Sequence, residues 1–502
     1  MSASIKLSES KEEQSIKYYV NKYYLTIIFI VFLVIILITN FMRYDNKKEA
    51  LLEEESYFYA RISQNFFQYS KTGLDEMNNN GRPFSYNLGF PFVISVLSKI
   101  TNLPVIFFIK YLSILLGLVI LLMLYWILKK LHLDWRIISL SLFFVVLSST
   151  FIYFSSFTSP FLFAVLLSLL SYYFFIMDSK RKSMFSGLFL SLIIFFDAYI
   201  AFFTLAFLII FTVTIRKNKK DIMKIDMIIF LLVLFIYYLF FYIKFGMIGA
   251  SSLGYIIKSN FGNIFDFSSD IGSIYGLSIF IIILCFFGIG DLWKEKYNNR
   301  GYYFALIFFI IISFLYKYAL FYLNFYMSFL AAIGLLRLIK TRWESEIVRK
   351  SLIGLLIICI IFSTVLYIGK LINYGPESRH EFGAKFIAQR NTDIDIIFTD
   401  PRYSYILNYY GIKTYIDGNY LYIKDIDQKL KDYNEILNTE NFNRLLELVN
   451  KYKITYIVIT IDMAKDLDFG KTKNILYNLR NTNRFKRVFA NNYLEIWRYE
   501  RI

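Results

Sequence analysis

Long apolar stretches alternate with short polar segments through the first 374 residues of the chain. An α-helix needs about 20 predominantly apolar residues to cross a hydrocarbon core of roughly 30 Å. The pattern therefore predicts a polytopic α-helical membrane protein with about 11 spans. The spans are expected at 24–42, 104–128, 137–177 (two), 184–215 (two), 226–243, 274–290, 301–337 (two) and 351–371.

Two of these stretches carry a single charge near the middle, Asp197 in 184–215 and Lys317 in 301–337. As one helix, the 32 residues of 184–215 would reach about 48 Å, which exceeds the thickness of the bilayer. Basic residues flank both stretches, so both ends of each are expected on the same side. We therefore predict two short spans in each stretch, with Asp197 and Lys317 at turns on the outer surface.

Lys and Arg gather in the polar segments that follow the second, fourth, sixth, eighth and tenth predicted spans. By the positive-inside rule these loops and the N-terminal residues 1–23 are cytoplasmic. The first external loop is then 43–88, and residues 375–502 are extracytoplasmic. The basic loops explain the net charge of +17, so nucleic acid is not expected as a partner. We expect a multi-pass protein of the cell membrane.

The loop 43–88 is the first long polar interruption, and it carries an acidic run at Glu53, Glu54 and Glu55. An apolar piece from Gly89 to Ile100 follows it. About 12 residues reach only some 18 Å as a helix, so this piece is too short to cross. It is predicted to be a juxtamembrane helix at the outer interface.

From Gly375 the composition becomes that of a soluble domain, predicted to be a small α/β domain over 375–502. Residues 493–499 alternate in polarity as an edge strand would. The domain contains no glycine-rich phosphate loop and no Ser/His/Asp triad. Helices are expected at 381–389, 403–410 and 442–452, and further strands at 394–399, 412–416 and 455–460.

Four short motifs form a recognisable pattern: Glu54 to Ile62, Leu88 to Pro91, the set Lys110, Ser113 and Gly117, and the pair Lys317-Tyr318. Together they resemble the GT-C superfamily of polyprenyl-phosphate-dependent membrane glycosyltransferases, most closely the protein O-mannosyltransferase and aminoarabinose-transferase type. The resemblance implies a GT-C-like transmembrane domain over 24–374. Two features depart from it: the acids are Glu rather than Asp, and the turn at Thr158 to Pro160 has no carboxylate.

Sugar transfer from a lipid phosphate needs a base for the acceptor hydroxyl and positive charge for the departing phosphate. Glu54 and Glu55 are the candidate catalytic bases; they could equally be a solvated helix N-terminus, where negative charge is favourable. Asp197 is the candidate to replace the missing acid, or it only caps a turn. The candidate phosphate-binding cations are Arg61, Arg82, Lys110 and Lys317, with lipid contact as their other interpretation.

The resemblance implies an enzyme that moves a sugar from a polyprenyl-phosphate carrier to an extracytoplasmic protein, glycan or lipid. Its partners would be that donor, membrane lipids and the acceptor. The alternative is a catalytically inactive GT-C-like lipid-carrier-binding scaffold, or a transporter. Transporters often show internal repeats and charges in mid-span. The chain has neither in its pattern, which favours the enzyme. No metal-ligand set stands out, and dependence on a divalent cation stays open.

Overall fold

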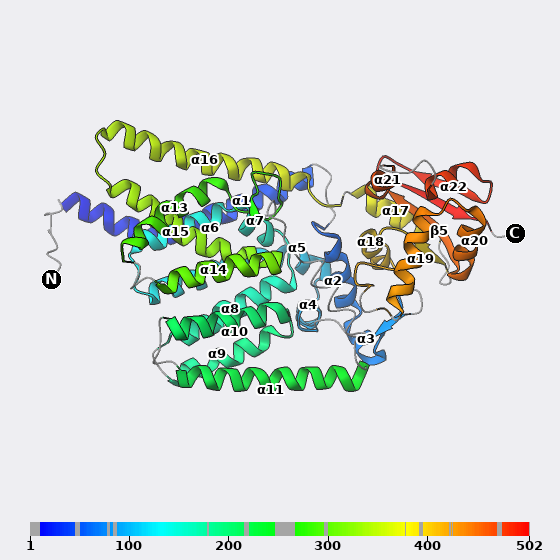
Figure 1. Cartoon of the computed structure of the whole chain (residues 1–502), viewed down its shortest axis with the longest axis horizontal. Coiled ribbons are helices and arrows are strands. Elements are labelled where there is room, and N and C mark those ends of the chain that lie inside the picture. The colour runs from blue at the N-terminus through cyan, green and yellow to red at the C-terminus, as the bar shows by residue number, and fades with distance from the viewer. Residues whose placement is uncertain are drawn as a thin grey trace.

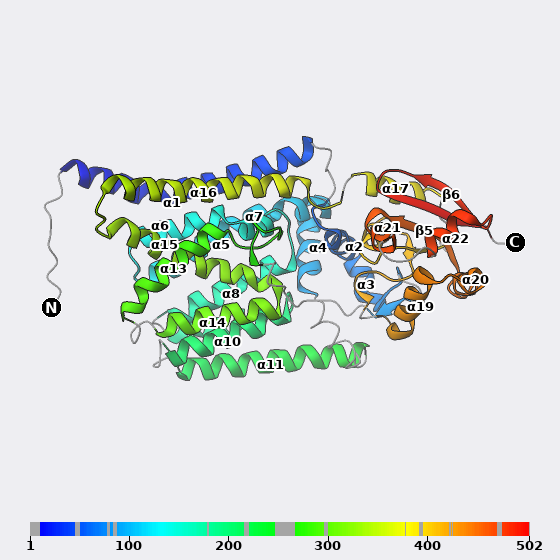
Figure 2. The same ribbon diagram turned by 45° about the horizontal axis from the view of Figure 1, so that its top comes forward.

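The computed structural model has a large helical body at its N-terminal side and a smaller α/β part at its C-terminal end (Figure 1). Two helices and a short hairpin from the first external loop lie between these two parts (Figure 2). The structure describes residues 11–45, 51–77, 81–83, 88–177, 180–214, 220–245, 267–295, 300–376, 378–390, 395–420, 423, 425–468 and 474–500.

Each segment predicted to span the membrane contains a helix. Five of the described helices are long and apolar enough to cross a membrane, or six if the bent pair α6 and α7 counts as one span. The chain thus has the helices of a multi-pass membrane protein, while the number of spans and their orientation stay predictions. The helices are α1 (Lys11–Asp45), α5 (Val105–Lys130), α6 (Trp135–Leu147), α7 (Ser149–Ser155), α8 (Pro160–Ile176), α9 (Lys180–Ile193), α10 (Ala198–Thr214), α11 (Lys220–Phe245), α13 (Ile279–Leu292), α14 (Arg300–Leu315), α15 (Leu320–Lys340) and α16 (Glu346–Asn373).

The two stretches with a central charge break where the sequence predicted. Asp197 lies in the turn between α9 and α10, and Lys317 begins the short 3₁₀ helix η4 (Lys317–Ala319) between α14 and α15. The predicted external loop 244–273 falls largely on residues 246–266, which lie outside the described residues.

Helices α13 and α15 cross at very close range because each has a glycine at the crossing. A Cβ atom added to Gly288 would lie 2.0 Å from the carbonyl oxygen of Leu330. One added to Gly334 would lie 2.0 Å from the carbonyl oxygen of Leu284. Small residues at such positions let helix backbones approach within a membrane, where dispersion contacts take over from the hydrophobic effect.

The C-terminal part is built on a five-stranded sheet with the order β4-β3-β5-β7-β6. Strands β4, β3 and β5 are parallel to one another, and β7 runs antiparallel to both β5 and β6. The strands are β3 (Ile396–Phe398), β4 (Lys413–Thr414), β5 (Ile454–Thr460), β6 (Phe485–Ala490) and β7 (Leu494–Tyr499). The helices are α17 (Ser378–Ala388), α18 (Tyr403–Tyr409), α19 (Ile426–Asn438), α20 (Phe442–Lys451), α21 (Ile461–Asp468) and α22 (Ile475–Asn481), with η3 (Trp293–Glu295) following α13 in the helical body.

The prediction of an edge strand at 493–499 is wrong. Strand β7 lies inside the sheet between β5 and β6, and both of its faces are packed. Leu494 and Ile496 belong to one buried cluster, whereas Trp497 and Tyr499 belong to another on the opposite face. The exposed side chain of Arg498 and the half-buried Glu495 produce the alternation that suggested one-sided burial.

The first external loop folds into α2 (Glu54–Gln64), α3 (Phe66–Thr72), the two-stranded pair β1 (Leu74–Asp75) and β2 (Arg82–Pro83), and α4 (Gly89–Thr101). The apolar piece that was predicted to be a short helix is thus helical, as α4, while its place at the membrane interface stays a prediction. One hydrophobic cluster combines side chains of α2 and α4 with side chains of α18, β5 and β7. The loop and the C-terminal domain therefore share one core, which fixes α2 between the two large parts of the molecule.

Candidate functional site

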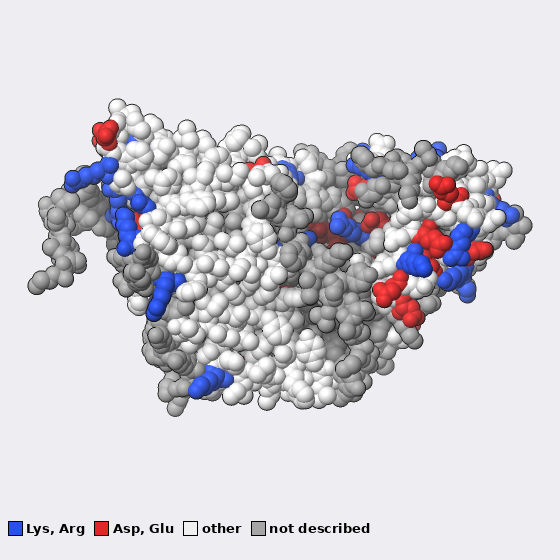
Figure 3. Space-filling model, viewed as in Figure 1, with Lys and Arg blue, Asp and Glu red and all other residues white. Residues whose placement is uncertain are grey.

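Three consecutive glutamates at the start of α2 lie in three different surroundings. Glu53 is the residue before the helix, and Glu54 and Glu55 form its first turn. All three side chains are half-buried, because the helical body and the C-terminal domain enclose them. Figure 3 shows charged side chains at the bottom of a hollow between these two parts.

Glu53 faces the helical body. The hydroxyl of Tyr153, on α7, donates a hydrogen bond to Oε1 of Glu53, and Tyr374 contributes another. Burial raises the pKa of Glu53 to about 7, against the lowering effect of the two tyrosine hydroxyls. Nearby, Nη1 of Arg43 donates to the carbonyl oxygens of Leu371 and Tyr374, both at 2.8 Å. These contacts join the end of α1 to the end of α16.

Glu54 faces the C-terminal domain. Burial raises its pKa, and the positive charge of Arg402 acts in the opposite direction. The carboxylates of Asp400 and Asp462 add to the rise. Asp400 follows β3, and Asp462 lies just after β5, so the carboxyl ends of two parallel strands point toward Glu54. The domain thus supplies one wall of the hollow.

Glu55 faces the turns of the helical body that carry Lys317 and Asp197. Its Oε1 accepts a hydrogen bond from the hydroxyl of Tyr59, one turn along α2, at 3.1 Å. Burial raises the pKa of Glu55, the positive charge of Lys317 lowers it, and the carboxylate of Asp197 raises it. Three residues that the sequence singled out independently are therefore close enough to interact electrostatically.

Asp197 lies at the predicted turn, and its side chain is buried within the protein. Its Oδ1 accepts a hydrogen bond from the backbone N–H of Ile200 at 3.1 Å, which caps the first turn of α10. Its Oδ2 accepts one from the hydroxyl of Tyr316 at 2.6 Å. Asp197 is thus both a helix cap and a link to the residue that precedes Lys317. The structure thus confirms that Asp197 caps a turn, while its role as a replacement for the missing acid stays a prediction.

A group of tyrosine rings surrounds Lys317 and Glu53. The Nζ atom of Lys317 lies 5.3 Å from the ring centre of Tyr275 and 5.5 Å from that of Tyr318. The ring of Tyr275 lies in turn 5.4 Å from that of Tyr153. Sequence reasoning missed these tyrosines, because 42 tyrosines are spread over the chain and nothing local marks the few that converge.

The other predicted cations lie in different settings. Arg61 is 2% exposed and forms a two-point ion pair with the fully buried Asp75, with N–O distances of 2.6 and 2.8 Å. Arg61 therefore joins two segments of the loop through this ion pair and does not face the hollow. Lys110 lies near the start of α5 with a half-buried side chain. The backbone of Arg82 pairs with Asp75 in the β1–β2 ladder, but its side chain lies outside the described residues.

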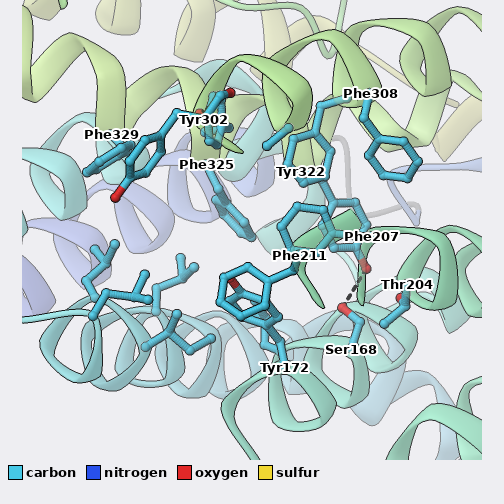
Figure 4. A pocket seen from close by; sticks show the side chains of 18 of the residues that line it. Ser168, Tyr172, Thr204, Phe207, Phe211, Tyr302, Phe308, Tyr322, Phe325 and Phe329 are labelled. Atoms are coloured by element: carbon cyan, nitrogen blue, oxygen red, sulfur yellow. Dashed lines mark hydrogen bonds between the residues drawn. The ribbon is translucent and has the colours of Figure 1, made fainter. Parts of the chain in front are cut away.

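An apolar cavity of about 220 Å³ lies among α5, α6, α8, α10, α14 and α15 (Figure 4). It is separate from the three glutamates, but Ile312 and Ala319 on either side of Lys317 line it. Gly301 lines it near the other end of α14. Aromatic rings from α8, α10, α14 and α15 line it, and the hydrogen-bonded hydroxyls of Ser168 and Tyr322, 2.7 Å apart, are among its few polar groups.

Metal ligands do not gather in the described parts of the chain. No group of three or more His, Cys, Asp or Glu side chains is arranged there as a cation site.

The fold is that of the GT-C glycosyltransferases. The archaeal oligosaccharyltransferase AglB from Archaeoglobus fulgidus aligns over 89% of this chain and 70% of its own, with a TM-score of 0.65 and 10% identity. The arabinofuranosyltransferase AftD from Mycobacteria aligns over 94% of this chain and 40% of its own, with a TM-score of 0.57 and 11% identity. ArnT from Cupriavidus metallidurans, bound to undecaprenyl phosphate, aligns over 93% and 97%, with a TM-score of 0.55 and 12% identity.

These similarities are structural. No protein-family model matches the sequence, and no curated protein matches it. The GT-C architecture predicted from the first external loop is therefore confirmed as a fold, at an identity too low to transfer the chemistry of any one relative.

Proposed function

We propose that the chain is a membrane glycosyltransferase that moves a sugar from a polyprenyl-phosphate carrier to an acceptor outside the cytoplasm. The observation that carries the proposal is the meeting of Glu55 on α2 with Lys317 and Asp197 at the turns of two helix pairs. A carboxylate next to a cation, at the membrane end of an enclosed hollow, meets the two electrostatic needs of this transfer.

Lys317 is the proposed partner of the carrier phosphate. It is a compact, flexible cation held at a turn, which suits a monophosphate or diphosphate oxygen. Ile312 and Ala319, which precede and follow Lys317 in the chain, line the apolar cavity, whose Phe, Leu and Tyr side chains are an environment for isoprenoid units. The structures of AglB with a dolichol-phosphate and ArnT with undecaprenyl phosphate support a lipid-phosphate ligand for this fold.

Glu55 is the proposed general base. In the transfer step, the acceptor hydroxyl gives its proton to the Glu55 carboxylate while its oxygen forms a bond to the anomeric carbon of the sugar. The bond from that carbon to the carrier phosphate oxygen breaks, and the phosphate leaves with the electron pair beside Lys317. Burial keeps the pKa of Glu55 raised, which makes the carboxylate a stronger base than a solvated one.

Glu54 is the second candidate base, and its surroundings assign it a different role. It faces Arg402 of the C-terminal domain, whereas Glu55 faces the proposed phosphate site. We therefore assign Glu54 to the acceptor side of the hollow, with the C-terminal domain as the wall against which a protein, glycan or lipid acceptor rests.

The distribution of charge supports the proposed orientation. Figure 3 shows basic side chains along the end of the helical body farthest from the C-terminal domain, and a broad uncharged band between the two. Lys129 and Lys130 end α5, and Arg337 and Lys340 lie in the last turn of α15. With that end in the cytoplasm, the hollow and residues 375–502 are outside.

The test compares Glu55→Gln and Glu54→Gln in purified protein, with polyprenyl-phosphate sugars extracted from the host as donor and release of free polyprenyl phosphate as the readout. Glu55→Gln is expected to lower transfer by about 10²- to 10⁴-fold, the range for a positioned base, without a change in carrier binding. Glu54→Gln is expected mainly to raise the acceptor concentration needed for half-maximal transfer. Glu76→Gln, an exposed change on the same loop, is the matched control.

Two results would contradict the proposal. If Glu55→Gln transfers sugar as fast as the wild type does, Glu55 is not the general base. Carrier binding by wild type without any transfer, tested over the extracytoplasmic glycans, lipids and peptides of the host, would favour the inactive lipid-binding scaffold instead.

A further inference from the structure

A short loop between residues 267 and 278 is fixed by an unusual number of hydrogen bonds. Within the loop, the backbone N–H of Leu277 donates to the carbonyl oxygen of Phe267 at 2.7 Å, and that of Ser269 donates to the oxygen of Leu277 at 3.1 Å. Asp270 accepts from the backbone N–H of Ile279 at 2.7 Å, which ties the loop to the start of α13.

Side chains from two other helices hold the loop from outside. From α7, Ser149 donates to the carbonyl oxygen of Gly276, and Thr150 donates to that of Tyr275 at 3.0 Å. From α16, Lys370 donates to the carbonyl oxygen of Ser273 at 2.8 Å. The hydroxyls of Ser363 and Tyr367, also on α16, donate to Asp270 and to the carbonyl oxygen of Ile274.

The residue after Tyr275 must be a glycine. A Cβ atom at Gly276 would lie 2.5 Å from the backbone of Ser268 and Ser269, closer than any side chain permits. The loop therefore folds back on itself at Gly276, and the backbone of Tyr275 is held on both sides. These hydrogen bonds hold the ring of Tyr275 next to Lys317 and Tyr153.

We propose that Tyr275 is a positioning residue that holds the ammonium group of Lys317 where the carrier phosphate binds. A lysine side chain has four rotatable carbons and loses much conformational freedom when it is fixed. The face of an aromatic ring attracts an ammonium group, and Tyr275 offers its face from a backbone that cannot shift. The loop 267–278 thereby becomes part of the donor site, and the inference rests on the function proposed above.

The proposal requires the ring and does not require the hydroxyl. The Nζ atom of Lys317 lies over the ring of Tyr275, 5.3 Å from its centre, and a phenylalanine ring offers the same face. Tyr275→Phe therefore keeps the interaction, whereas Tyr275→Leu removes the ring and leaves a smaller apolar side chain. If Tyr275 only packs against its neighbours, Tyr275→Leu weakens carrier binding equally whether or not Lys317 is present. The effect of Tyr275→Leu must therefore be measured both with Lys317 and without it.

The experiment is a double-mutant cycle on binding of polyprenyl monophosphate in detergent micelles. Tyr275→Phe and Tyr275→Leu are prepared in the wild-type and in the Lys317→Met backgrounds. In the wild-type background Tyr275→Leu is expected to weaken binding by about 3- to 30-fold, the range for a cation–π contact, and Tyr275→Phe by less than about 2-fold. In the Lys317→Met background the three Tyr275 forms are expected to bind alike. Tyr477→Leu, an exposed tyrosine of the C-terminal domain, is the control for a change in ring content and is expected to bind as wild type does.

The outcomes separate this inference from the proposed function. If Lys317→Met leaves binding unchanged, the donor site itself is wrong. If Lys317→Met weakens binding but Tyr275→Leu acts equally in both backgrounds, the loop only stabilises the fold and the positioning role is overturned. The same holds if Tyr275→Phe is as damaging as Tyr275→Leu, since the ring would then not be the active part.

Discussion

Replacing Glu53 by Gln should remove a pH dependence from the stability of the folded protein. Burial raises the pKa of Glu53 from its usual 4.5 to about 7. Between these two values the folded protein holds a proton on Glu53 that the unfolded chain has lost. Because the folded state binds more protons there, stability falls as the pH rises from about 4.5 to about 7 and then levels off.

The size of the effect follows from the shift. A change of this size in pKa corresponds to about 3 kcal/mol of unfolding free energy lost across the window. Glu53→Gln keeps the shape of the side chain and an oxygen that accepts from Tyr153, but it does not titrate. The free energy of unfolding of the variant should therefore rise relative to that of the wild type as the pH rises. Above about pH 8 the difference between the two proteins should be constant.

Thermal unfolding in detergent, followed for both proteins from pH 4.5 to pH 8.5, measures this difference. The exposed Glu76→Gln serves as control, because its curve should run parallel to that of the wild type. If the curves of Glu53→Gln and wild type are also parallel through the window, Glu53 is ionised in the folded protein. The account of a buried, proton-holding carboxyl beside Tyr153 would then be refuted.

Two further changes test the scaffold. Arg61→Met removes the cation that pairs with the buried Asp75 and should lower stability by about 3–5 kcal/mol, while the double change with Asp75→Leu should restore most of it. Chemical unfolding measures both variants, and an unaffected single variant would show that this ion pair does not stabilise the loop. Gly288→Ala should prevent the close crossing of α13 and α15 and lower the melting temperature. Gly354 has open space around it, so Gly354→Ala should leave the melting temperature unchanged. Equal melting temperatures for the two variants would argue against the tight crossing.

The parts of the fold that were predictable from sequence depend on local signals. A charge in the middle of an apolar run marks a break, and both Asp197 and Lys317 lie at such breaks. The length of the apolar piece at Gly89 was enough to predict α4 as a short helix. Glu55 and Lys317 were predicted near the same membrane face by topology alone, and the structure brings them within electrostatic reach of each other.

The parts that were not predictable depend on packing between distant segments. Arg61 is paired with Asp75 through a turn that no periodic pattern marks. Glu53 differs from its two neighbours because Tyr153, on α7, and Tyr374, the residue after α16, contact it. Likewise, β6 has two charged residues at its centre and gave no strand signal, so the internal position of β7 beside it could not be foreseen.

The core shared by α2 and the C-terminal domain has a consequence for the order in which the protein is made. The glutamates of α2 are made soon after the first helix, whereas Ile406, Val458 and Ile496, which share a core with α2, are made only after all the helices of the helical body. A nascent chain therefore inserts its helices while the side chains of α2 still lack their partners. We expect the candidate site on α2 to be completed only after the helical body has been made, when the C-terminal domain folds against it.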